Sequence, residues 1–143
     1  MEAKELMIGD WVECVDSTHK KKVYAQIDAI EEGQTCILVR LDNCNWFLDI
    51  SFIKPIPLTP EILEKNGIFK RRFKGHVEEC YSATANPISN EQFILWEETD
   101  RFELVLRHIV DNLTYSALRC KVKYIHELQH ALMVCEIEKE IVL

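Results

Sequence analysis

The chain has 143 residues, of which 48% are hydrophobic and 29% are charged, and its formal net charge is −7. This length and composition allow one compact domain or two small modules with a packed core, so they exclude a large multidomain enzyme and a wholly disordered chain. The acidic charge is divided into −4 over residues 1–58 and −3 over residues 59–143. Neither part is therefore a basic arm of the kind that binds nucleic acids.

The expected compartment is the cytoplasm. Residues 1–7 alternate charged and apolar side chains, and no later apolar run approaches the roughly 20 residues that span a bilayer. The six cysteines are scattered and no two of them form a C-x-x-C pair. In a reducing compartment they are expected to be mostly buried thiols rather than disulfides or metal ligands.

Residues 1–58 have the pattern of a small antiparallel β-module. Alternating or β-rich segments at 11–15, 23–29, 36–40 and 46–53 are separated by short turn sequences. Four short strands in so few residues favour a small barrel. The opening Ile8-Gly9-Asp10-Trp11-Val12 is similar to the first strand of Src-homology-3-like (SH3-like) barrels such as Tudor and KOW domains.

A proline-rich crossing follows, because three of the six residues from Pro55 to Pro60 lack an N–H group. Thr59 is a good N-cap with Pro60 at the first helical position, and Asn66-Gly67 supplies a left-handed stop. The sequence therefore predicts a short helix over 60–66.

Residues 59–143 are expected to form an α+β module. Strands are predicted near 68–74, 78–84, 92–98, 101–109 and 118–124, with a hairpin joining the third and fourth. From Tyr124 the spacing changes to that of an amphipathic helix, about 125–135, whose apolar residues are Ile125, Leu128, Leu132 and Cys135. The predicted fold class is thus α+β: an SH3-like module, a short helix, and a second antiparallel sheet packed by a C-terminal helix.

Three blocks, at residues 5–12, 54–67 and 123–132, resemble a group of uncharacterised short proteins of gut Bacteroidales and of their phages and mobile elements. The blocks span both ends and the middle of the chain, so the resemblance covers the whole architecture. It implies the order of parts given above and an origin in a phage or mobile element, and it implies no activity.

One string has the form of a catalytic motif. His126-Glu127-Leu128-Gln129-His130 is an H-E-x-x-H sequence, in which two imidazoles one helical turn apart bind zinc and the glutamate polarises a water molecule. On a helical wheel, however, His126 and His130 lie opposite the apolar face, so we expect them to face solvent. A third ligand would have to come from upstream, for example from His76 or His108. A zinc-dependent hydrolase using His126, Glu127 and His130 is therefore the alternative to a chain without catalytic residues or cofactor.

A second alternative is nucleic-acid binding by a concentrated basic segment interleaved with Phe69 and Phe73. Its cationic residues are Lys65, Lys70, Arg71, Arg72 and Lys74. The same pattern is typical of an edge strand with a solvated face, and the surrounding charge is acidic. We therefore do not expect a nucleic-acid partner.

The aromatics Trp11, Trp46 and Phe52 could line a peptide groove on the first module, but we expect them mainly in its core. The function that remains is that of a non-catalytic accessory or protein-interaction protein. Its partner is an unknown protein bound through the first module or exposed sheet edges. Self-association is also compatible with so many short strands.

Overall fold

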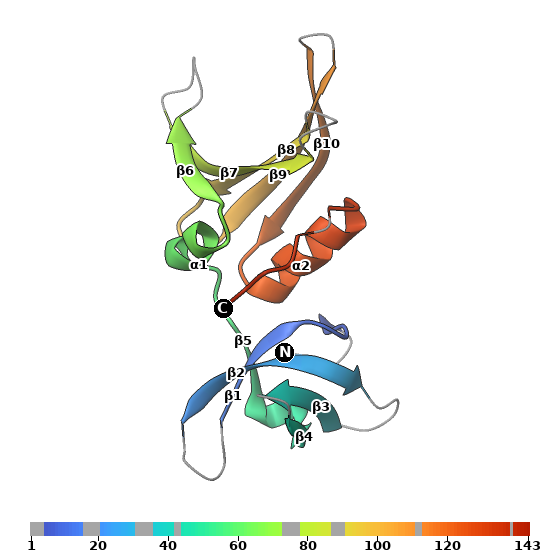
Figure 1. Cartoon of the computed structure of the whole chain (residues 1–143). Coiled ribbons are helices and arrows are strands. Elements are labelled where there is room, and N and C mark those ends of the chain that lie inside the picture. The colour runs from blue at the N-terminus through green and yellow to red at the C-terminus, as the bar shows by residue number, and fades with distance from the viewer. Residues whose placement is uncertain are drawn as a thin grey trace. The chain divides into compact units, whose positions relative to one another are not determined.

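The structure is a computed structural model of the whole chain, and it describes residues 5–15, 21–30, 36–41, 44–72, 78–86, 91–110, 113–137 and 139–143. The chain divides into two compact units, Met1–Pro57 and Leu58–Leu143, which we call unit 1 and unit 2 (Figure 1). Each unit contains one antiparallel five-stranded sheet, and the described helices longer than one turn belong to unit 2. The expected mixture of two antiparallel sheets and a short C-terminal helix is therefore confirmed.

The sheet of unit 1 has the strand order β4-β3-β2-β1-β5. Its strands are β1 (Trp11–Val15), β2 (Lys22–Ile30), β3 (Cys36–Leu41), β4 (Cys44–Asp49) and β5 (Ile53–Pro55). Every neighbouring pair is antiparallel. Among the described strands β4 and β5 are the two edges, so the sheet is open and is not closed into a barrel.

The single strand expected over 46–53 is interrupted, and that prediction is wrong in this detail. The Asp49 carboxylate accepts a hydrogen bond of 2.8 Å from the Ser51 backbone N–H and caps a 3-10 helix, η2, over Ile50–Phe52. Side-chain capping of this kind competes with a strand ladder. The chain then resumes as β5, in which Pro55 pairs with Val12. A proline is tolerated there because β5 lies at the sheet edge.

The core of unit 1 is formed by one face of this sheet. Val12 and Cys14 are buried alternately along β1, and they pack with apolar side chains of the other strands. Buried in this cluster are Leu6, Val12, Cys14, Ala25, Ile27, Val39 and Ile53. The Gly9-Asp10 turn leads into β1: Gly9 has a φ of 93°, and the Asp10 carboxylate accepts a 2.7 Å hydrogen bond from the Met7 backbone N–H.

The sheet of unit 2 has the strand order β10-β9-β8-β7-β6. Its strands are β6 (Phe69–Arg72), β7 (Glu79–Asn86), β8 (Glu91–Glu97), β9 (Phe102–Val110) and β10 (Leu113–Val122). The predicted hairpin is confirmed as β8 and β9, in which Glu97 pairs with Phe102 around a short turn. Strand β10 begins five residues earlier than the predicted segment, and a register shift between Ser116 and Leu118 divides it.

Helix α1 (Pro60–Lys65) has the caps that its sequence predicts. The Thr59 hydroxyl accepts a hydrogen bond of 3.4 Å from the Ile62 N–H, and Gly67 has a φ of 72°. Asn66 also connects α1 to the end of the chain. Its side-chain amide donates to the Val142 carbonyl at 2.9 Å, and its oxygen accepts from the Val142 N–H at 2.8 Å.

Helix α2 (Ile125–Val134) packs against β10 (Figure 1). Its side chains Ile125, Leu128 and Leu132 are buried, as the helical spacing predicts. Leu95 and Leu104, which are register partners on β8 and β9, are also buried. The burial of apolar side chains from the helix and the sheet is the main stabilisation of unit 2.

Candidate functional site

The His-Glu-x-x-His string forms the first half of α2, but the prediction that both histidines face solvent is wrong for His126. Only 4% of His126 is exposed, and His130 is half-buried. The Tyr124 ring stacks on the His126 ring with 5.8 Å between centroids, and the His130 ring lies 5.8 Å away on an inclined plane. Tyr124 precedes the helix in extended conformation. A helical wheel of residues 125–135 leaves out Tyr124, whose ring stacks on His126. This is why His126 was wrongly expected to face solvent.

Glu127, the candidate catalytic residue of the string, caps the helix instead. Its Oε2 accepts hydrogen bonds from the backbone N–H of Lys123 at 2.6 Å and of Tyr124 at 3.1 Å. It is the third helical residue, where glutamate commonly reaches back to the N-cap backbone. This oxygen therefore already holds two donors, whereas polarising a metal-bound water requires an oxygen that can accept its proton.

A third metal ligand is also missing from the described part of the chain. No three His, Cys, Asp or Glu side chains within it come close enough together to hold a metal ion. His108 lies on β9, but its side chain, like the whole of His76, lies outside the described residues. His126 and His130 are thus brought together as a pair, and the zinc alternative stays a prediction.

The basic segment is divided by the structure into residues with different surroundings. On β6, Lys70 forms an ion pair of 3.3 Å with Glu97, and Arg72 forms one of 3.3 Å with Glu79. The hydrogen bond to Glu97 is the main reason that the pKa of Lys70 is raised. The exposed Lys65 ends α1, the exposed Arg71 points to the other side of β6, and Lys74 lies outside the described residues.

The same strand borders an open recess of about 450 Å³. Its lining residues are Lys70, Arg72, Glu78, Glu79, Trp96 and Glu97. Three carboxylates and two cations therefore face the space in which a phosphate would have to bind. Because like charges repel a phosphate backbone, this surface does not support the nucleic-acid alternative.

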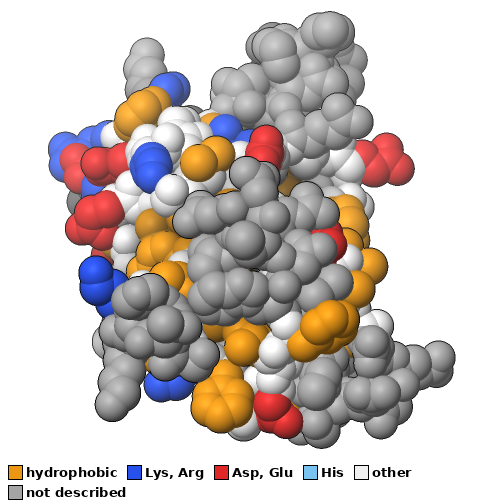
Figure 2. Space-filling model, turned by 60° about the horizontal axis from the view of Figure 1, so that its bottom comes forward, with side chains coloured by type: hydrophobic (Ala, Val, Ile, Leu, Met, Phe, Trp, Pro, Cys, Tyr) orange, Lys and Arg blue, Asp and Glu red, His pale blue; other side chains and the backbone are white. Residues whose placement is uncertain are grey.

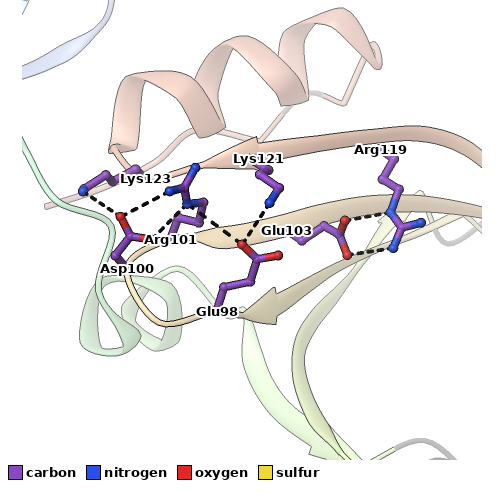
Figure 3. A network of polar contacts seen from close by, with 7 residues as sticks. All are labelled: Glu98, Asp100, Arg101, Glu103, Arg119, Lys121 and Lys123. Carbon is purple, nitrogen blue, oxygen red and sulfur yellow. Dashed lines mark hydrogen bonds and ion pairs between the residues drawn. The ribbon is translucent and has the colours of Figure 1, made fainter.

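A network of ion pairs connects β9, β10 and the turn between β8 and β9 (Figure 3). Arg119 on β10 holds the Glu103 carboxylate with two hydrogen bonds of 2.7 and 3.0 Å. Asp100, in the turn between β8 and β9, binds both Arg101 and Lys123. A further contact joins Lys121 to Glu98.

These partners hold the carboxylates in the ionised form. The hydrogen bond from Arg119 lowers the pKa of Glu103, and hydrogen bonds from Arg101 and Lys123 lower the pKa of Asp100. A general acid requires a raised pKa near the working pH. Glu103 and Asp100 therefore help to join β9, β10 and the β8–β9 turn, and neither is an acid of the type that catalysis uses.

Unit 1 carries exposed apolar side chains on the face opposite its core. In the strand register Val15 pairs with Lys22, and Tyr24 pairs with Glu13, so all four share the outer face. Phe52, the last residue of η2, directly precedes Ile53, whose register partner Cys14 is the neighbour of Val15 along β1. The exposed fractions are 48% for Tyr24, 59% for Phe52 and 38% for Val15. We call Val15, Tyr24 and Phe52 the outer-face patch.

The outer-face patch was missed at the level of sequence. Phe52 was expected in the core, whereas Trp11 is half-buried and the Trp46 side chain lies outside the described residues. Exposed hydrophobic side chains of the described residues are visible at several places in Figure 2. Tyr24 lies diagonally across from Val15, at the roughly 7–8 Å typical of such pairs, and Phe52 precedes the strand on the other side of β1. One partner segment can therefore reach all three side chains.

None of the described helices has the length and hydropathy needed to cross a lipid bilayer. No protein-family model, curated protein or solved structure matches the chain.

Proposed function

We propose that the protein is a non-catalytic interaction protein that docks a protein partner on the outer-face patch of unit 1. The single observation that carries this proposal is the exposure of Val15, Tyr24 and Phe52. Apolar side chains that remain exposed on one face of a sheet often mark a binding surface, because burying them on association is favourable.

The proposal includes an SH3-like arrangement for unit 1. It is supported by the strand order β4-β3-β2-β1-β5 and by the 3-10 helix η2 between β4 and β5. The resemblance to short proteins of phages and mobile elements supports an accessory role in such an element, in the cytoplasm. The engagement of Glu127 in helix capping disfavours the hydrolase alternative.

The test compares two surface variants in a retention assay. The full chain is immobilised as wild type, as a Tyr24→Ser/Phe52→Ser double variant, and as a Phe47→Ser control, and each is exposed to lysate of a host that carries the gene. Phe47 is 66% exposed on β4, so it matches Phe52 in type and exposure. Proteins retained by the wild type and by the control are expected to be lost from the double variant. Equal retention by all three would refute the proposal.

A further inference from the structure

The charged residues around the outer-face patch indicate the chemistry of its partner. Lys54 on β5 and Tyr24 on β2 are both register partners of Glu13, so Lys54 lies on the outer face with the patch. Lys22 lies on the same face as the partner of Val15. Two ammonium groups therefore flank the apolar side chains.

Glu13, the carboxylate between Tyr24 and Lys54 in the strand register, is largely covered. Lys22 contacts Glu13 at 3.0 Å, and the exposed fractions of their side chains are 72% for Lys22 and 14% for Glu13. Among the described residues, no carboxylate forms an ion pair with Lys54. A partner that approaches this face at Val15 thus meets apolar surface and the exposed ammonium groups of Lys22 and Lys54, although residues 1–58 together carry a charge of −4.

From this arrangement we infer that the outer-face patch binds a protein segment with apolar side chains flanked by one or two carboxylates. The inference rests on the proposed function and adds the partner's chemistry. Opposite charges at the rim of an interface favour the correct partner and its orientation. A nucleic acid fits less well, because it brings a phosphate with every nucleotide toward a unit that is acidic as a whole.

The test uses three fluorescein-labelled ten-residue peptides with the same Leu-Phe-Leu centre, flanked on both sides by Glu, Gln or Lys. Binding to the full-length protein is measured by fluorescence polarisation at low salt. The Glu peptide is expected to bind roughly fivefold more tightly than the Lys peptide, which corresponds to the strength of one or two exposed ion pairs. Raising the salt concentration should reduce this difference.

Variants of the protein separate the apolar contribution from the charged one. Lys54→Glu is expected to remove or reverse the preference for the Glu peptide. Phe52→Ser is expected to weaken the Glu peptide at least about fivefold, as loss of a buried aromatic anchor does. Phe47→Ser is the matched control and should leave binding unchanged. In the strand register Phe47 on β4 pairs with Leu38 on β3, and Leu38 pairs with Ala29 on β2. Ala29 lies five residues along β2 from Tyr24, which is about 17 Å along the strand.

Several results would overturn the inference. If all three peptides bind equally and Phe52→Ser weakens them all, the patch docks proteins but the charge preference is wrong, and the proposed function stands. If the Lys peptide binds best, or if no peptide binds, the partner chemistry is wrong, and the retention assay decides the proposed function separately. Tighter binding of a labelled oligodeoxynucleotide, or a dimer of the protein that Phe52→Ser dissociates, would assign the patch to a different occupant.

Discussion

Substitution of Glu127 tests whether its carboxylate caps α2 or acts as a catalytic base. In Glu127→Ala the backbone N–H groups of Lys123 and Tyr124 lose the oxygen that accepts their hydrogen bonds. Loss of a capping interaction costs about 0.5–2 kcal/mol, and loss of a negative charge at a helix N-terminus costs about 0.3–1 kcal/mol. We therefore expect a loss of about 1–2 kcal/mol in the free energy of unfolding of unit 2. Glu127→Gln keeps an oxygen acceptor, so the expected loss is smaller, about 0.3–1 kcal/mol.

The assay is urea unfolding followed by far-UV circular dichroism, with zinc titration of the same samples. Glu64→Ala serves as the control, because Glu64 is an exposed glutamate on α1 and surface substitutions usually change stability by less than about 0.5 kcal/mol. If Glu127→Ala were as stable as Glu64→Ala, the capping role would be refuted. If zinc supported hydrolysis that both Glu127 variants abolish, the non-catalytic proposal would fail as well.

Two further predictions concern the stability of unit 2. Because Arg119 lowers the pKa of Glu103 below its ordinary value of 4.5, this pair stabilises the fold above that pH and the contribution is lost as the pH falls through the folded-state pKa. The free energy of unfolding of Arg119→Ala should therefore fall less between pH 5 and pH 3 than that of the wild type; parallel curves would refute this. Leu128→Ala, at a fully buried position, should lose about 2–5 kcal/mol in urea unfolding, whereas Met133→Ala, at a position 55% exposed, should stay within about 0.5 kcal/mol. Equal losses in the two variants would contradict the assigned orientation of α2.

Much of the secondary structure could be predicted because local signals agree with the tertiary packing. Thr59, Pro60 and Gly67 each supply a backbone or capping property that a short helix needs at its ends, and the structure uses all three. The helical spacing of Leu128 and Leu132 likewise predicts the buried side of α2. Such signals act within a few residues, so they do not depend on the rest of the fold.

The outer-face patch could not be predicted, because one local interaction changes which side chains point outward. Period-two spacing from Trp46 places Leu48, Ile50 and Phe52 on a single face if the strand is continuous. The Asp49 carboxylate instead caps η2, and the turn resets the alternation before Ile53 enters the core. Aromatic residues of a small β-module usually belong to its core, so Phe52 is expected there, but it closes η2 and is exposed.

The H-E-x-x-H string and the basic segment have the form of a catalytic and of a nucleic-acid-binding motif. In the structure, residues of both form contacts within the fold. Glu127 holds backbone N–H groups, and Lys70 and Arg72 hold carboxylates of neighbouring strands. Residues with such partners lose those contacts if they turn to a substrate or phosphate, so a function based on them would compete with folding. The side chains of Tyr24 and Phe52, in contrast, are exposed and largely apolar. Their exposure gains nothing for the fold, and covering them with a partner would be favourable, which is why the interaction is placed on unit 1.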